Sequence, residues 1–380
     1  MQNQAHCDKS EIIPPTGRFA PSPSGRLHLG NLACSLLAWL SARSRGGRIV
    51  LRIEDLDAER CPRLYADLLE QDLDWLGLVW DEGGSTGGPN GPYYQSECAE
   101  IYASSFRKLE DRGLVYPCFC SRAQLHAASA PHTSDGNVIY PGTCRGLTAA
   151  EIAEKRKKKA PAYRLMVPDE EITFVDGCMG PHTENLLRDC GDFYLRRADG
   201  VFAYQLAVVV DDAAMGVTEV VRGCDLLGST PRQIYLQHLL GLPTPHYAHI
   251  PLLMSPGGRR LSKRDRDLDL GELRARFGTP EALLGWLAGQ TGIAPDTTPR
   301  SAEQLVEHFS WDVIRKHREN IVMSERTFVE QTAAHPNERF DSDAAETHLS
   351  PEGFDTFCEI LDSPVSQATK ALLERKAAWE

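Results

Sequence analysis

Hydrophobic and polar positions change period repeatedly along the first quarter of the chain. Residues Leu29 to Ala42 and Leu64 to Leu76 carry apolar side chains at helical spacing. The run Arg48 to Ile53 between them is apolar and β-branched, which is typical of a strand. Another short strand is expected just before Gly25. This strand–helix–strand–helix order predicts a parallel sheet with helices packed on its faces.

The same alternation returns after residue 200. The apolar run Gln205 to Val210 predicts a buried strand, Thr230 to Leu240 a helix, and Ile250 to Met254 the last strand of the sheet. Helical patterns follow at Leu268 to Phe277 and at Pro280 to Ala288. We therefore expect an α/β fold, with a doubly wound parallel (Rossmann-like) sheet and a small C-terminal α-helical module.

Composition narrows the class of protein. The chain has 380 residues, of which 42% are hydrophobic and 25% charged, so it can bury an enzyme-sized core. It has no apolar run of the roughly 20 residues that cross a bilayer, and no apolar N-terminal stretch of signal-peptide length. We expect a cytoplasmic location and no membrane partner.

The formal net charge of −12 argues against a protein that holds nucleic acid through an overall positive field. It does not exclude RNA, because local Lys and Arg patches neutralise phosphates. The run Lys155 to Lys159 is one such candidate. The interpretation that we prefer is the solvated face of a helix, because a charge run usually is one.

Two short motifs, about 230 residues apart, carry the candidate chemistry. The segment PSPSGRLHLGN ends at Asn31 and places His28 and Gly30 at the start of a helical run, where free backbone N–H groups favour a phosphate. The segment RLSKR places Lys263 on a loop after the Ile250 to Met254 run. Ligands of such sheets lie beyond the carboxyl ends of the strands, so both loops can enclose a triphosphate.

Eleven cysteines scattered through a cytosolic-looking chain do not indicate a disulfide framework. One group differs from the rest, because a CxC pair is followed by YPGTC. Its members are Cys118, Cys120, Tyr140 and Cys144. Three thiolates and a phenol in one segment suit a structural, tetrahedral Zn²⁺. His126 and His132 lie between them, and either could replace Tyr140, since imidazole is the commoner zinc ligand.

The two motifs resemble the HIGH and KMSKS signatures of class I aminoacyl-tRNA synthetases. Four further segments resemble the glutamyl-tRNA synthetase group, over roughly residues 16 to 325. They are GRFAPSPSG at Gly17, LRIEDLD at Leu51, AYQLAVVVDDA at Ala203 and VVRGCDLLGSTPRQ at Val220. Within that group, the variant IEDLD, the run GDFYLRRADGVFAYQLAVVVDDA, and CFC followed by YPGTC are most similar to the shortened glutamyl-Q tRNA(Asp) synthetase family.

The resemblance implies activation of L-glutamate by ATP with Mg²⁺, and a role for each matching residue. Catalysis would involve His28 and Lys263. ATP would be bound by His28, Gly30, Asn31 and Lys263. Glutamate would be bound by Arg18, Phe19, Ala20, Pro21, Ser22, Glu54, Tyr204 and Arg222. Zinc would be held by Cys118, Cys120, Tyr140 and Cys144. The chain departs from the signatures at Asn31, which replaces the second His of HIGH, and at Arg260 and Arg264, which flank the KMSKS-like core.

The expected organisation has five parts. Residues 1–115 and 203–265 would form the catalytic domain, 116–202 an insertion with the zinc site, 266–325 a helical module that contacts the RNA stem, and 326–380 an acidic tail of unknown role. That tail is too short for two anticodon-binding domains, which together need on the order of 150 to 200 residues.

The resemblance therefore implies a monomer that transfers glutamate to queuosine at the wobble position of tRNA(Asp). Two other interpretations stay open. One is a truncated glutamyl-tRNA synthetase that charges tRNA(Glu), and the other is a catalytically silent RNA-binding regulator.

Overall fold

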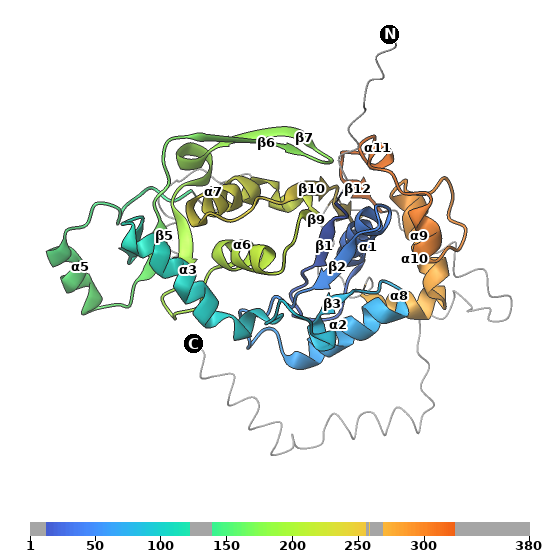
Figure 1. Ribbon diagram of the computed structural model, residues 1–380, viewed down its shortest axis with the longest axis horizontal. Coiled ribbons are helices and arrows are strands. Elements are labelled where there is room, and N and C mark those ends of the chain that lie inside the picture. Colours follow the sequence, from blue (N-terminus) through green and yellow to red (C-terminus); the bar gives the residue numbers. More distant parts are fainter. Residues whose placement is uncertain (1–12, 122–138, 256–257, 259–268, 324–380) are drawn as a thin grey trace, which may run out of the picture. The chain divides into compact units, whose positions relative to one another are not determined.

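Two parallel sheets form the centre of the computed structural model, which describes residues 13–121, 139–255, 258 and 269–323. Strands β1 (Thr16–Phe19), β2 (Arg48–Leu51) and β3 (Glu82–Gly83) form one sheet, and β9 (Glu219–Gly223) pairs with β10 (His246–Ile250) in the other. Strand β9 lies beside β1, and the Thr218 amide donates to the Thr16 carbonyl at 2.9 Å. The fold is mixed α/β with parallel sheets, as the alternating pattern predicts (Figure 1).

The remaining elements of the described residues surround these sheets. The helices are α1 (Leu29–Arg43), α2 (Arg63–Trp75), α3 (Ala99–Asp111), α5 (Ala149–Arg156), α6 (Tyr204–Ala214), α7 (Thr230–Leu240), α8 (Leu270–Phe277), α9 (Pro280–Gln290), α10 (Ala302–Val306) and α11 (Trp311–Ile314). The strands are β4 (Val115–Cys118), β5 (Ala162–Leu165), β6 (Glu171–Asp176), β7 (Gly180–Asn185), β8 (Phe193–Arg196), β11 (Leu253–Met254) and β12 (Ile321–Val322).

Helix α1 follows β1 and packs against β1, β2 and β9. Its inner face carries Leu32, Leu36 and Leu40, which are completely buried. Each such side chain contributes about 1.5 to 3 kcal/mol through removal of apolar surface from water. This packing holds the first turn of α1 at the carboxyl end of β1, and it confirms the helix predicted from Leu29 onward.

The prediction of a strand at Gln205 to Val210 is wrong, because these residues lie in helix α6. The stretch from Leu206 to Asp212 is buried throughout, so it has no exposed polar face that would show a helical period. Its valines favour strands when judged alone. Tyr204 accordingly begins a helix rather than a strand. The predicted strand Ile250 to Met254 is divided into β10 and β11, because Pro251 lacks the N–H that a continuous ladder needs.

A second region contains the antiparallel sheet β4-β5-β8 and the hairpin β6–β7. The hairpin runs along the top of Figure 1, above α7, and its turn reaches β10. There the Gly177 amide donates to the Tyr247 carbonyl at 2.8 Å, and Arg315 donates to the Gly177 carbonyl at 2.7 Å. The hairpin turn is thus held against a strand of the central sheets.

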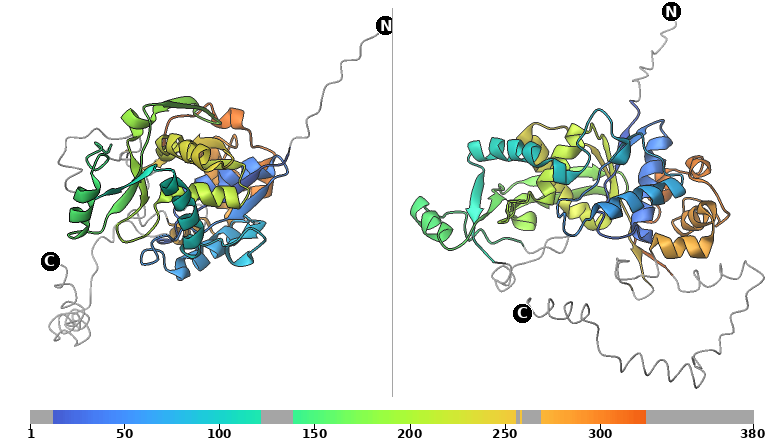
Figure 2. Two further views of the ribbon diagram at one scale, coloured as in Figure 1. Left: turned by 60° about the vertical axis from the view of Figure 1, so that its left-hand side comes forward. Right: turned by 90° about the horizontal axis from the view of Figure 1, so that it is seen from below.

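Helices α8, α9 and α10 pack against one another in turn, and α10 packs against α1. The right-hand view of Figure 2 shows this helical part, in orange, beside the blue N-terminal part of the chain. Trp311 donates through its indole N–H to the Ser41 hydroxyl at 3.0 Å, and β12 pairs with β11. Helices predicted near Phe277 and from Pro280 are therefore present. Within the described ranges, no helix combines the length and hydrophobicity needed to cross a bilayer.

Candidate active site

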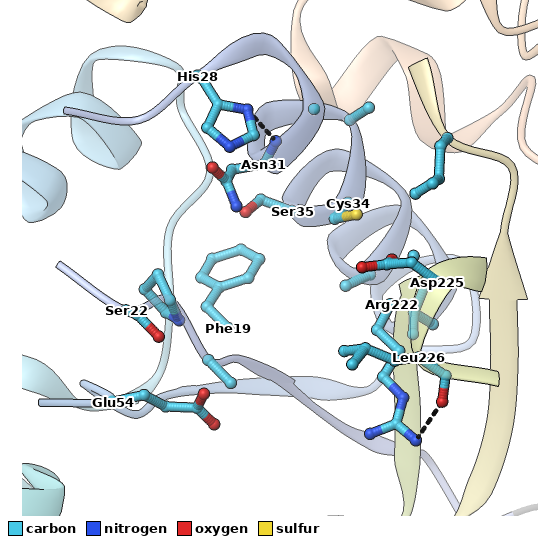
Figure 3. A pocket seen from close by; sticks show the side chains of 18 of the residues that line it. Phe19, Ser22, His28, Asn31, Cys34, Ser35, Glu54, Arg222, Asp225 and Leu226 are labelled. Atoms are coloured by element: carbon cyan, nitrogen blue, oxygen red, sulfur yellow. Dashed lines mark hydrogen bonds between the residues drawn. The ribbon is translucent and has the colours of Figure 1, made fainter. Parts of the chain in front are cut away.

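A cavity of about 530 Å³ opens beyond the carboxyl ends of β1 and β9, beside the first turns of α1. It is lined by all the predicted ATP and glutamate residues that the structure describes. They are Arg18, Phe19, Ala20, Pro21, Ser22, His28, Gly30, Asn31, Glu54, Tyr204 and Arg222. In Figure 3, Glu54 and Arg222 lie on opposite sides of one end of the cavity, while His28 and Asn31 lie at the other end. Lys263 and the RLSKR segment lie outside the described residues.

His28 occupies the cap position of α1, where its Nδ1 accepts from the Asn31 amide at 3.4 Å. The ring packs over Gly30, and a Cβ at that position would stand 3.2 and 3.3 Å from two imidazole atoms. The backbone before it bends at Gly25, whose φ of 150° disfavours other residues. Local sequence therefore sets the orientation of the imidazole at the mouth of the cavity.

A buried ion network forms the floor at the Glu54 end. Arg52 is completely buried, and its guanidinium lies 3.0 Å from Glu54 and 2.5 Å from Asp212. Arg18 is held nearby by a hydrogen bond to the Val221 carbonyl at 2.9 Å, and its Nε lies 3.9 Å from Asp212. Burial raises the pKa of Glu54, and Arg52 opposes that rise. The site thus contains a carboxylate and arginines that are removed from water, where their interactions with a ligand of opposite charge are strong.

Arg222 is 5% exposed and belongs to β9. Its Nε donates to His249 at 2.9 Å and its Nη2 donates to the Thr230 hydroxyl at 2.9 Å. Its Nη1 has no hydrogen-bond partner among the residues that the structure describes. In Figure 3, the terminal nitrogen without a dashed bond points across the cavity towards Glu54. An arginine with one buried, unpaired N–H group is suited to an anionic ligand.

The structure adds cavity residues that the sequence reasoning did not select. Cys34 and Ser35 line it from α1, and Asp225 lines it from the segment after β9. Helical spacing from Asn31 would have identified the first two. Asp225 follows a strand of the central sheets by two residues, and this position beyond a strand end was the available signal.

The three predicted zinc-ligating cysteines come together. The Sγ atoms of Cys118, Cys120 and Cys144 all lie within 4.8 Å of one another. The Tyr140 hydroxyl lies 3.5 Å from the Cys118 sulfur and 3.7 Å from the Cys120 sulfur. Ligands of a tetrahedral zinc with bonds of about 2.3 Å are about 3.8 Å apart, so this donor set fits a metal ion. The alternatives His126 and His132 lie outside the described residues.

The groups around this cluster also favour ionised forms of the metal-binding side chains. The Arg164 guanidinium lies 3.7 Å from the centre of the Tyr140 ring, and the Cys144 amide donates to the Tyr140 oxygen at 2.8 Å. The basic run 155–159 ends nearby, because the ammonium of its last residue, Lys159, lies 3.4 Å from the Cys120 carbonyl. Residues 155–159 are all exposed, which agrees with both interpretations of that run.

Comparison with known proteins identifies the family of this chain. Residues 16–328 match the family described as tRNA synthetases class I (E and Q), catalytic domain. The chain is 52% identical over 309 residues to a glutamyl-Q tRNA(Asp) synthetase of Symbiobacterium thermophilum, and this match covers 80% of the chain and 94% of the relative. It is 44% identical over 322 residues to glutamate–tRNA ligase 1 of Halorhodospira halophila, covering 80% of the chain but 67% of that ligase.

A solved structure agrees with these matches. The crystal structure of a glutamate tRNA ligase from Elizabethkingia meningosepticum, in complex with its amino acid, superimposes with a TM-score of 0.71 and 28% identity. The similarity covers 84% of this chain and 69% of that one. The chain belongs to the glutamyl-Q tRNA(Asp) synthetase family of the class I tRNA synthetases.

Proposed function

We propose that this protein activates L-glutamate with ATP and transfers the glutamyl group to queuosine at the wobble position of tRNA(Asp). The observation that carries this proposal is the cavity in which Glu54 and Arg222 face each other at one end and His28 lies at the other. One end can hold an amino acid by its charges, and the other can hold a nucleotide. The identity of 52% to a glutamyl-Q relative, against 44% to a glutamate ligase, favours queuosine over a tRNA 3′ end.

The reaction has two steps. The α-carboxylate of glutamate attacks the α-phosphorus of ATP, the bond to the bridging oxygen breaks, and pyrophosphate leaves. Mg²⁺ bound with ATP would neutralise part of the phosphate charge. A nucleophilic group of queuosine then attacks the acyl carbon and AMP leaves. Negative charge develops on phosphoryl oxygens in the first step, so donors and cations placed beside them provide the rate enhancement. His28 and Lys263 take this role, and Gly30 and Asn31 line the nucleotide end.

Glutamate is bound by groups of complementary charge. Arg222, with Arg18 nearby, receives the side-chain carboxylate, since the guanidinium fork suits a carboxylate. Glu54 receives the α-ammonium group. The walls between them are formed by Phe19, Ala20, Pro21, Ser22 and Tyr204. Burial raises the pKa of Glu54, and the charge and hydrogen bond of Arg52 oppose that rise and favour the ionised carboxylate.

The cysteine cluster binds a structural zinc ion through Cys118, Cys120, Cys144 and Tyr140. The spacing of these donors and the arginine stacked on Tyr140 support this assignment. In this proposal the parallel sheets are the halves of a doubly wound, Rossmann-like catalytic domain, residues 1–115 and 203–265. Residues 116–202 form the zinc-containing insertion and 266–325 a module that contacts the RNA stem, and the protein acts as a monomer.

The decisive experiment measures transfer of labelled glutamate to purified queuosine-containing tRNA(Asp) and to tRNA(Glu), each with and without periodate. Periodate destroys the 3′-terminal ribose diol. Because periodate can also oxidise queuosine, a matched sample has this base protected during the oxidation and deprotected before the transfer assay. We expect label on tRNA(Asp) that does not depend on the 3′ ribose. Label only on untreated tRNA(Glu) would identify a minimal glutamyl-tRNA synthetase instead.

A variant separates the enzyme from a silent regulator. Lys263→Ala should lower glutamate-dependent ATP–pyrophosphate exchange by at least about a hundredfold, since it removes a cation that stabilises the transition state. Unchanged exchange in a folded Lys263→Ala protein would contradict the role proposed for this lysine. Absence of exchange and transfer in the unmodified protein would favour the regulator.

A further inference from the structure

A buried chain of three side chains connects the hairpin β6–β7 to the cavity. Asp176 Oδ2 lies 2.6 Å from His249 Nδ1, and His249 Nε2 lies 2.9 Å from Arg222 Nε. Asp176, His249 and Arg222 are 2%, 0% and 5% exposed. Each comes from a different strand, namely β6, β10 and β9. Only Arg222 lines the cavity, so the other two act on it from behind.

The geometry settles which nitrogen of His249 carries the proton. Arg222 Nε–H is always a donor, so His249 Nε2 must accept, and the ring proton must then sit on Nδ1. That N–H donates to Asp176 Oδ2. Burial lowers the pKa of His249 to about 4, which keeps the ring neutral. A neutral ring with its proton on Nδ1 satisfies both neighbours at once.

Asp176 is itself fixed from outside the cavity. Its Oδ1 accepts the amides of Cys178 at 2.9 Å and Met179 at 2.8 Å, both in the hairpin turn, and the His249 amide at 3.0 Å. These bonds leave Oδ2 directed at the imidazole. The hairpin turn therefore fixes the orientation of the Asp176 carboxylate, and this carboxylate fixes the orientation of the His249 ring.

The guanidinium of Arg222 is therefore held by hydrogen bonds at two of its three nitrogens. Nε is bound by His249 and Nη2 by Thr230, which leaves Nη1 for a ligand. A free arginine side chain loses rotamer entropy when a ligand fixes it, and fixing it before binding removes that cost from association.

We propose that His249, oriented by Asp176, is a positioning residue that aims Arg222 and so determines the affinity of the site for the glutamate side-chain carboxylate. This inference rests on the proposed function, because it assumes that Arg222 binds that carboxylate. Neither Asp176 nor His249 touches the substrate, and neither takes part in the chemical steps.

Asp176→Asn is the sharpest test. The amide oxygen should keep the place of Oδ1, because two backbone N–H groups of the turn point at it. The amide nitrogen then faces His249 Nδ1 as a donor, and the ring proton moves to Nε2, opposite the Arg222 Nε–H. In this tautomer the Nε2–H group of His249 and the Nε–H group of Arg222 face each other as two donors. They cannot form a hydrogen bond, so the Arg222 side chain turns away. We expect the KM for glutamate in ATP–pyrophosphate exchange to rise about tenfold to a hundredfold, with the KM for ATP unchanged.

Two substitutions of His249 form a matched pair. His249→Gln places an oxygen near the position of Nε2 and keeps an acceptor for Arg222. His249→Asn places its amide near Nδ1 and keeps the partner of Asp176, but it leaves Arg222 without an acceptor. We expect His249→Asn to raise the glutamate KM about tenfold or more and His249→Gln to raise it less than about threefold. A merely structural role would affect both alike and would not single out glutamate.

Arg222→Ala distinguishes the role of Arg222 in glutamate binding from the positioning role of His249. Glutamate affinity is also measured by calorimetry, and folding is checked by thermal unfolding. If Arg222→Ala leaves the glutamate KM unchanged, the assumed role of Arg222 fails. If Arg222→Ala raises it but folded Asp176→Asn does not, or if the two His249 variants respond equally, the positioning role is overturned and the proposed function stands.

Discussion

The guanidinium of Arg52 lies 3.0 Å from the carboxylate of Glu54 at the edge of the cavity. Arg52 is completely buried and the Glu54 side chain is 9% exposed, so this pair is largely screened from water. Because burial raises the pKa of Glu54, a nearby cation is needed to keep a negative charge available for an ammonium group.

Glu54→Gln removes the charge and keeps the shape of the side chain. We expect the KM for glutamate to rise about tenfold to a hundredfold, since a charged hydrogen bond to the ammonium group is lost. Steady-state exchange kinetics measure the effect. Glu97→Gln, at an exposed position away from the cavity, is the control. An equal KM in Glu54→Gln and in the unmodified protein would remove Glu54 from the binding site.

Acid sensitivity is expected from His249. Its pKa is about 4 in the folded protein and about 6.5 when unfolded. Between these values the unfolded chain binds a proton that the folded protein does not, so this contribution to stability is complete above pH 6.5 and is lost as the pH falls through 4. The cost between pH 7 and pH 5 is about 2 kcal/mol.

Denaturant unfolding of the unmodified protein and of His249→Gln, at pH 7 and pH 5, isolates this term. Burial raises the pKa of Asp211 to about 6, which acts in the opposite direction, so the comparison of the two proteins is the relevant quantity. We expect His249→Gln to lose about 2 kcal/mol less than the unmodified protein over this interval. Parallel pH profiles would be inconsistent with a neutral, buried His249.

Gly30→Ala should disturb the nucleotide end of the cavity. The added methyl carbon would stand 3.2 Å from the His28 ring, so the imidazole must move by a few tenths of an ångström. We expect exchange activity to fall about tenfold or more, because small displacements of a catalytic group are costly, while thermal stability changes little. Gly146→Ala is the matched control, since its methyl group would meet nothing within 4 Å. Equal activity of the two variants would refute this role for His28.

Metal analysis of the purified protein should find about one zinc ion per chain. Cys120→Ser should lower the zinc content and the unfolding temperature, whereas Cys61→Ser, outside the cluster, should change neither. His126→Ala and His132→Ala should retain the metal if Tyr140 is the fourth ligand. Loss of zinc in either histidine variant, with retention in Tyr140→Phe, would transfer that role to the histidine.

Much of the candidate site follows from sequence because its residues act through local structure. The cap at His28 and the packing of its ring over Gly30 depend on neighbouring positions in the chain. The same holds for the CxC pair at Cys118 and Cys120, which places two sulfurs within a few residues. Helix α1 is readable from its first half, where buried leucines alternate with partly exposed positions, namely Gly30, Asn31, Cys34 and Ser35.

Helix α6 shows where this reasoning fails. Its central residues are buried on every side, so no polar face marks a period, and Val208 to Val210 favour a strand by propensity alone. Burial between neighbouring elements decided the conformation. No local rule could weigh that packing against the preference of three valines.

The sequence by itself determined the family, the parallel α/β order, and the residues that line the cavity from single motifs. Only the tertiary structure decided that Asp176 and His249, 73 positions apart, stand behind Arg222. The reason is physical. Hydrogen bonds of about 3 Å act between neighbours in space, and the turn of hairpin β6–β7 becomes a neighbour of β10 only when the chain folds.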